Sequence, residues 1–135
     1  MYLIDTNVLS ELRRPRPHPA VLEWFAAIDE QHIYLSAVTM GEVQTGIEDL
    51  RVRDSSMAAE LQRWADMVMQ THVVLPMDGD AFRLWARLMY GKSPHLYEDA
   101  MIAATAKLNG LTVVTPNTRD FRELEVPTLD PFSPA

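Results

Sequence analysis

The sequence predicts an α/β fold in which a parallel sheet of four to five strands is flanked by helices on both faces. Short apolar, β-branched runs alternate along the chain with longer segments whose apolar residues recur at helical spacing. Strands that are separated by helices imply parallel pairing and a sheet covered on both sides. The length of 135 residues is typical of one domain, so we expect a single domain over residues 1–135.

The strands are predicted from runs of three to five apolar or β-branched residues. Four such runs are clear, and they span residues 2–4, 33–35, 73–75 and 111–115. A weaker pattern at Thr128 and Leu129 predicts the fifth strand.

The helices are predicted from apolar residues spaced three or four positions apart. In chain order they span residues 8–12, 19–27, 39–50, 55–69, 78–89 and 98–108. In the helix over 78–89 the apolar residues expected to face the core are Phe82, Trp85, Leu88 and Met89. The prolines between Arg14 and Pro19 predict a loop. Asn109-Gly110 is typical of the left-handed end of a helix.

Composition excludes several classes of protein. The absence of cysteine excludes a disulfide scaffold and any thiolate metal site. No apolar run approaches the ~18 residues of a membrane span, and the N-terminus lacks the basic region of a signal peptide. We therefore expect a cytoplasmic protein without a membrane partner. The net charge of -7 argues against a broad nucleic-acid-binding surface.

Four acidic residues are expected at one edge of the sheet. Asp5 directly follows the first strand, and Asp120 is expected in the loop after the fourth. Glu42 and Asp99 are expected in the first turns of their helices. Because strand ends and helix starts share one edge of a parallel sheet, these four carboxylates are expected to converge on one cleft.

Each of these residues also has a purely structural interpretation. Asp5 could cap a helix, and Thr39 with Glu42 fits the spacing of a capping box. Asp99 could complement a helix dipole, and Asp120 could form an Asx turn. The apolar flanks of Asp5 and Asp99 favour the functional interpretation, because they indicate carboxylates held at the edge of a packed core.

Convergent carboxylates repel one another, and a hard cation removes that cost. Ligand sets made only of oxygen favour Mg²⁺ or Mn²⁺. The four histidines are scattered without the i, i+4 pairing of a zinc site, at His18, His32, His72 and His95. The residues alone therefore indicate a magnesium or manganese site at the edge of the sheet.

Four motifs, in order along the chain, resemble the PIN-domain family. They are IDTNVLSEL from Ile4, the pair Gly41-Glu42, DAMIAATA from Asp99 and VVTPNTRDF from Val113. The resemblance covers nearly the whole chain and is closest to the VapC-like toxins of bacterial toxin–antitoxin pairs, including the FitB-like branch.

The resemblance implies a Rossmann-like fold and a Mg²⁺-dependent ribonuclease, with Mn²⁺ as a possible substitute. It implies that the catalytic, metal-binding residues are Asp5, Glu42, Asp99 and Asp120. It further implies support from Thr6 and Asn117, inhibition by a small cognate antitoxin, an RNA substrate and a homodimeric assembly.

The chain departs from the family pattern at two places. Pro116 stands where an arginine is common in the family, which removes a possible phosphate contact and leaves open a catalytically weak module that acts by binding partners. Glu98 directly precedes Asp99, and adjacent helical residues point about 100° apart, so only one of them faces the metal. The alanines at 103 and 106 continue the face of Asp99, which favours Asp99.

A basic run from Arg13 to His18 is the densest cluster of positive charge. Arg14 and Arg16 are candidates for binding RNA phosphates, with Arg119 and Lys107 as weaker ones, and a solvated loop is the alternative. The three tryptophans lie on helical apolar stripes, at Trp24, Trp64 and Trp85, and are expected in the core or an interface.

An aspartate directly after the first strand is also typical of aspartyl-phosphate transferases. The haloacid dehalogenase type needs a second aspartate where this chain has Asn7, which argues against that class.

Overall fold

A computed structural model describes residues 1–133 and contains one sheet of five strands in the order β3-β2-β1-β4-β5. The strands are β1 (Tyr2–Ile4), β2 (Ile33–Ser36), β3 (Val73–Leu75), β4 (Thr112–Val114) and β5 (Thr128–Leu129). Every neighbouring pair is parallel. The predicted α/β class is therefore confirmed, and the fifth strand exists as a two-residue pairing with β4. The last two residues of the expected domain, 134–135, lie outside the described residues.

The helices lie between the strands, as the sequence predicts. They are α1 (Thr6–Leu12), α2 (Pro19–Ala27), α3 (Ala37–Arg51), α4 (Ser55–Thr71), α5 (Gly79–Met89), α6 (Tyr97–Asn109) and α7 (Thr118–Glu123). Two single 3₁₀ turns, at Glu30–His32 and Pro94–Leu96, precede β2 and α6. Gly110 ends α6 with φ of 64°, in the expected left-handed conformation. Within residues 1–133, no helix is long and apolar enough to cross a membrane.

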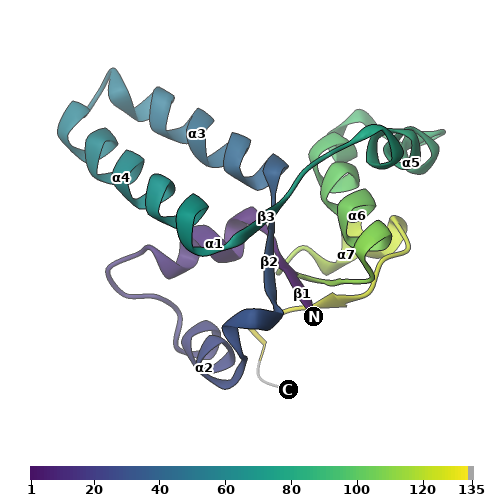
Figure 1. Cartoon of the computed structure of the whole chain (residues 1–135), viewed down its shortest axis with the longest axis horizontal. Helices are drawn as coiled ribbons and strands as arrows, with labels where there is room; N and C mark the ends of the chain where they lie inside the picture. Colours follow the sequence, from purple (N-terminus) through teal and green to yellow (C-terminus); the bar gives the residue numbers. More distant parts are fainter. Residues whose placement is uncertain (134–135) are drawn as a thin grey trace.

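Alternation along the strands builds a core on each face of the sheet. Leu3 of β1 and Val113 of β4 pack with α5, α6 and α7 on one face. Their neighbours Ile4 and Val114 pack with α1, α2 and α4 on the other. Figure 1 shows α5, α6 and α7 grouped on one side of the central strands. The two-sided covering predicted from the sequence is confirmed.

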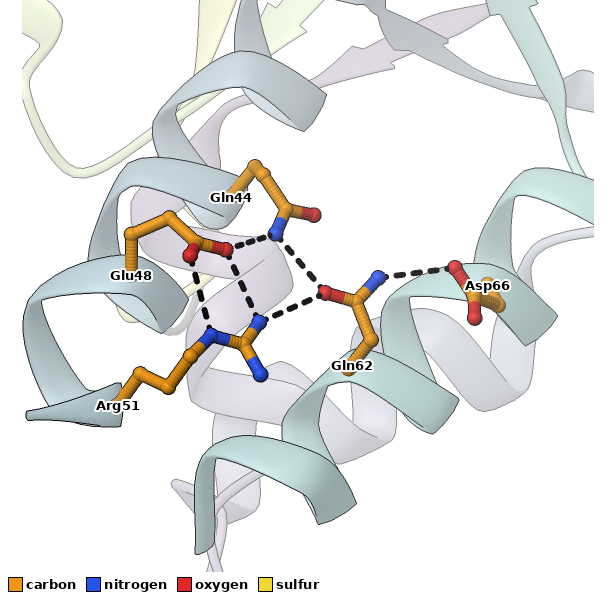
Figure 2. A network of polar contacts seen from close by, with 5 residues as sticks. All are labelled: Gln44, Glu48, Arg51, Gln62 and Asp66. Carbon is orange, nitrogen blue, oxygen red and sulfur yellow. Dashed lines mark hydrogen bonds and ion pairs between the residues drawn. The ribbon is translucent and has the colours of Figure 1, made fainter. Parts of the chain in front are cut away.

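Helices α3 and α4 form a hairpin that extends away from the sheet (Figure 1). The hairpin has its own apolar cluster, built on buried Ile47, Ala58 and Ala65 with half-buried Leu61 and Trp64 packed against them. A polar network joins the two helices on their exposed side (Figure 2), and its members are Gln44, Glu48, Arg51, Gln62 and Asp66. The two helices of the hairpin are thus joined by apolar packing on one side and by hydrogen bonds on the other.

Two helix starts differ from the prediction because side chains cap them earlier. Helix α1 begins at Thr6 rather than residue 8, since the Asp5 side chain accepts from the Thr6 N–H. Helix α3 begins at Ala37 rather than at Thr39, because Ser36 Oγ accepts from the Val38 N–H. The capping-box interpretation of Thr39 is therefore wrong.

Two other expectations were also wrong. Helix α7 was not predicted: its six residues contain a single buried apolar side chain, Phe121, which leaves no periodic pattern to recognise. On α5, Phe82 was expected to face the core but is 46% exposed, and its ring lies edge-on to Trp85. Met89 is buried and Trp85 half-buried, as expected.

Candidate active site

The site lies at the carboxyl ends of the two central strands. β1 pairs with β2 on one side and β4 on the other, so the direction in which the sheet grows reverses between β1 and β4. In open α/β sheets, this switch point is where ligands bind. The residues that follow β1 and β4 are Asp5 and Thr115, and both are buried.

Asp5 caps α1 and also belongs to the site. Its Oδ1 accepts a hydrogen bond from the Thr6 N–H at 2.8 Å. Its Oδ2 accepts one from the Thr115 hydroxyl at 2.7 Å. The structural and functional interpretations of Asp5 therefore do not compete, because the cap fixes the carboxylate at the strand end.

Thr115 is a site residue that sequence reasoning missed. It was assigned to the end of a strand, although β4 ends at Val114. Its hydroxyl donates to Asp5 and accepts from the Asn117 N–H at 3.0 Å, so it joins the segment after β1 to the segment after β4. Its position directly after a central strand could have identified Thr115 as a site residue, because the same position identified Asp5.

Asn117 brings Asp99 and Asp120 together. Its Nδ2 donates to Asp99 Oδ2 at 2.9 Å and to Asp120 Oδ2 at 3.0 Å. Asp99 lies in the first turn of α6 as expected and is half-buried, whereas Glu98 is exposed. Asp120 lies in the first turn of α7, so its predicted place in a loop was wrong. Asn117 thus contacts two of the four predicted acids, and its supporting role stays a prediction.

Glu42 approaches the site from α3. It lies beyond the first turn of that helix, and its Oε1 accepts from the Thr6 hydroxyl at 2.6 Å. The Thr6 and Thr39 hydroxyl oxygens lie 3.1 Å apart, and Thr39 is fully buried. The expected first-turn position of Glu42 was wrong because α3 begins at Ala37, and the carboxylate contacts α1 instead of its own helix start.

The carboxyl groups influence one another electrostatically. Burial first, and then the negative charges of Asp5, Asp120, Glu42 and Glu98, together raise the pKa of Asp99 from 3.8 to about 6. Burial also raises the pKa of Asp5, against the opposing effect of its hydrogen bond from Thr115. The pKa of Glu42 is raised by burial and by the charges of Asp5 and Glu98. The four acids thus form one electrostatic cluster.

The cluster has little positive charge to balance it. Among residues 1–133, no lysine or arginine forms an ion pair with these four carboxylates, and exposed His95 places Nε2 4.0 Å from Asp120 Oδ1. The all-oxygen donor set has the chemistry that Mg²⁺ prefers. In the described part of the chain, however, no three acidic or histidine side chains lie close enough together to hold a metal ion as they stand. The Asn117 amide occupies the position between Asp99 and Asp120.

The predicted phosphate-binding residues have different surroundings. Arg14 is exposed, and its Nε lies 3.7 Å from Glu11 Oε1. Arg16 and Arg119 are exposed, the latter beside Asp120 in α7. Lys107 donates to the Glu125 carbonyl at 2.8 Å, which gives it a structural role.

Arg13 has a more distinctive position than these candidates. It lines a pocket of about 210 Å³ between α1 and the α3–α4 hairpin, together with Thr6, Ser10, Glu42, Val43, Gly46, Ile47, Leu61 and Trp64. Its Cζ lies 5.9 Å from the centroid of the Trp64 ring. All three tryptophans are half-buried against apolar clusters, as predicted.

Comparisons with known proteins agree with the fold and the order of the motifs. A family model described as PIN domain matches residues 2–127. The chain is 31% identical to Toxin FitB of Neisseria gonorrhoeae, over 98% of this chain and 99% of that protein. It is 32% identical to VapC ribonuclease Y4jK of Sinorhizobium fredii, over 100% of both.

Solved structures give the same result. The structure of FitAB bound to an IR36 DNA fragment contains a chain that matches with a TM-score of 0.74 and 28% identity, over 100% of this chain and 98% of that one. The crystal structure of FitAcB from Neisseria gonorrhoeae matches with a TM-score of 0.73 and 29% identity, over 98% and 99%. The fold, the motif order and the family match together show that the chain belongs to the PIN-domain family.

Proposed function

We propose that the chain is a metal-dependent endoribonuclease and the toxin component of a toxin–antitoxin pair. The observation that carries the proposal is the electrostatic influence of Asp5, Glu42 and Asp120 on Asp99 near the switch point of the sheet, with no lysine or arginine paired to these four acids among residues 1–133. Two relatives support it by name, one a toxin and one a ribonuclease.

The cofactor we propose is Mg²⁺, with Mn²⁺ as a substitute, and its ligands would come from Asp5, Glu42, Asp99 and Asp120. When bound, the ion would polarise a phosphoryl oxygen of RNA and lower the pKa of a bound water. Since protons compete with metal ions for a carboxylate, the raised pKa of Asp99 makes metal binding pH-dependent.

The residues around the acids act by holding them in place. The Thr115 hydroxyl orients Asp5, and the Thr6 hydroxyl orients Glu42. The Asn117 amide holds Asp99 and Asp120 beside each other through one oxygen of each carboxylate, Oδ2. The Oδ1 atoms of both carboxylates would remain available to a metal ion.

The proposed partners are RNA, a cognate antitoxin and a second copy of the chain. The net charge of -7 and the unpaired acids favour an inhibitor segment that carries arginine or lysine. Light scattering tests the proposed homodimer, and a clean monomer at every concentration would contradict it.

A second candidate is a catalytically weak module that acts by binding a partner. The observation that favours it is the spacing of the acids, of which no three in the described chain stand at ligand distance from a common point. The exposed Pro116, in place of a residue able to donate to phosphate, also favours it. This candidate predicts tight partner binding without any metal-dependent cleavage.

The test is cleavage mapping of total cellular RNA with and without Mg²⁺. We expect the wild type to cut only with the metal, and Asp5→Ala and Asp99→Asn to lose cleavage while remaining folded. Asp49→Asn is the matched control, because Asp49 is an exposed acid on α3 outside the site. Equal cleavage by Asp99→Asn and Asp49→Asn would refute the proposed site.

A further inference from the structure

We propose that the pocket between α1 and the α3–α4 hairpin is a nucleobase subsite that selects one nucleotide beside the bond to be cut. This inference rests on the proposed ribonuclease function. It concerns the residues of the pocket that the acidic site does not use, above all Arg13 and Trp64.

The pocket is continuous with the acidic site. Thr6 and Glu42 line it, and the same two residues hydrogen-bond to each other at the edge of the acidic cluster. A nucleotide whose phosphate lies at the acids therefore has its neighbouring base within reach of this pocket. The other cavities that the structure shows share no residue with the acidic cluster.

The lining of the pocket suits a flat, partly polar ring. Its apolar lining comes from Val43, Ile47 and Leu61, and the Trp64 indole adds an aromatic ring. Unpaired bases are bound in proteins by stacking on aromatic or apolar side chains and by hydrogen bonds to their edges. Ser10 supplies a hydroxyl at the rim for such an edge contact.

Arg13 supplies the positive charge. Its Cζ lies over the Trp64 ring, 5.9 Å from the centroid, which is near the outer limit of a cation–π contact. Within the described chain it makes no side-chain hydrogen bond or ion pair. Its donors therefore remain available for a phosphate or a base edge.

The two walls of the pocket are fixed before any ligand binds. Val43 and Ile47 come from α3, and Leu61 and Trp64 come from α4. Next to them, Gln44 Nε2 donates to Gln62 Oε1 at 2.8 Å, within the network of Figure 2.

Further hydrogen bonds extend this network along each helix. Arg51 donates twice to Glu48, at 3.0 Å each, and Gln62 Nε2 donates to Asp66 Oδ1 at 3.0 Å. A pocket whose walls are held in this way needs little reorganisation to bind, which favours selective recognition.

Glycines on α3 provide a matched pair of test variants. Gly46 lines the pocket, whereas Gly41 lies on the same helix and does not. At both positions an added Cβ meets no atom within 4 Å, so neither substitution forces a clash. Gly46→Leu fills the pocket, and Gly41→Leu makes the same change in helix composition outside it.

The first measurement is sequencing of the ends produced from a pool of single-stranded RNA with randomised sequence. We expect wild type and Gly41→Leu to share a preference of about tenfold or more at one position beside the cut, the order of a base-stacking contribution. We expect Gly46→Leu and Trp64→Leu to lose it. Wild-type cleavage with no base preference, or an unchanged preference in Gly46→Leu, would overturn the subsite.

A second measurement is independent of cleavage, so that failure of the subsite and failure of the nuclease can be told apart. The protein is titrated with each of the four nucleoside monophosphates in the absence of metal, and its tryptophan fluorescence is recorded. We expect at least one to quench wild type and Gly41→Leu but not Gly46→Leu, with Trp64→Phe identifying the responding ring. Quenching without any Mg²⁺-dependent cleavage would overturn the proposed ribonuclease activity and would still support the proposed base-binding pocket. Absence of quenching by all four would overturn the base pocket itself.

Discussion

The Thr115 hydroxyl lies 2.7 Å from Asp5 Oδ2, although 110 positions separate the two residues in the chain. This bond joins the carboxyl ends of β1 and β4, which pair in the centre of the sheet. Both side chains are buried. The carboxylate at the centre of the site is thus oriented by Thr115, a residue that was predicted only as the end of a strand.

Replacing Thr115 by Val should destabilise the protein by about 1 to 3 kcal/mol, because Asp5 loses a donor and the Asn117 N–H loses its acceptor in a buried place. Urea unfolding measures the change. Thr115→Ser keeps the hydroxyl and should lie much closer to wild type. Equal losses in both variants would assign the effect to packing and contradict the hydrogen-bond account.

Replacing Asp99 by Asn should stabilise the metal-free protein at pH 7, because it removes a charge that the folded state disfavours. The shift from 3.8 to about 6 corresponds at full strength to ~3 kcal/mol. Since Asp99 is only half-buried and screened by solvent, we expect about 1 kcal/mol. The control Asp49→Asn should change the free energy of unfolding by less than about 0.5 kcal/mol. A lower free energy of unfolding in Asp99→Asn would contradict the proposed repulsion between Asp99 and the other carboxylates in the folded state.

The difference in stability between wild type and Asp99→Asn should depend on pH in a defined direction. A raised pKa means that the folded state holds the Asp99 proton more tightly than the unfolded state between pH 3.8 and about 6. The free energy of unfolding of wild type, relative to the variant, therefore falls as pH rises through this window and levels off above it. Urea unfolding of both proteins from pH 4 to 8 measures this difference. An increase in the relative stability of wild type with pH would contradict the raised pKa.

Of the two loop arginines, Arg16 should contribute more to RNA binding than Arg14, because Arg14 already lies beside Glu11. If Arg16 contacts one phosphate, Arg16→Ala should reduce the slope of log binding constant against log salt by about 0.7. Filter binding of single-stranded RNA at several salt concentrations measures the slope. An unchanged slope would leave Arg16 as part of a solvated loop.

The fold could be predicted from the sequence because the patterns that determine it are local. Periodic apolar residues on helices and β-branched runs on strands predicted every strand and six of the seven helices in the described chain. Helix α7 was missed because Phe121 alone is buried in it. The choice of Asp99 over Glu98 also came from local periodicity, and it agrees with the bond from Asn117.

The contacts that orient the acids could not be predicted, because they join distant segments. Glu42 fits a local capping box, yet its carboxylate bonds to Thr6, 36 residues away. Thr39 carries no sequence pattern that separates a site hydroxyl from a buried helix threonine, and only its place directly after a central strand distinguishes Thr115 from a strand threonine. Their roles depend on the parallel register that places β4 beside β1.

The central claim is that Asp99 belongs to a cluster of carboxylates whose repulsion a hard cation relieves. The most direct measurement is a ¹³C NMR titration of the Asp99 carboxyl, assigned with Asp99→Asn, with and without Mg²⁺. We expect a pKa of about 6 without metal and a clear decrease with saturating Mg²⁺. A pKa near 3.8 that Mg²⁺ does not change would contradict the account.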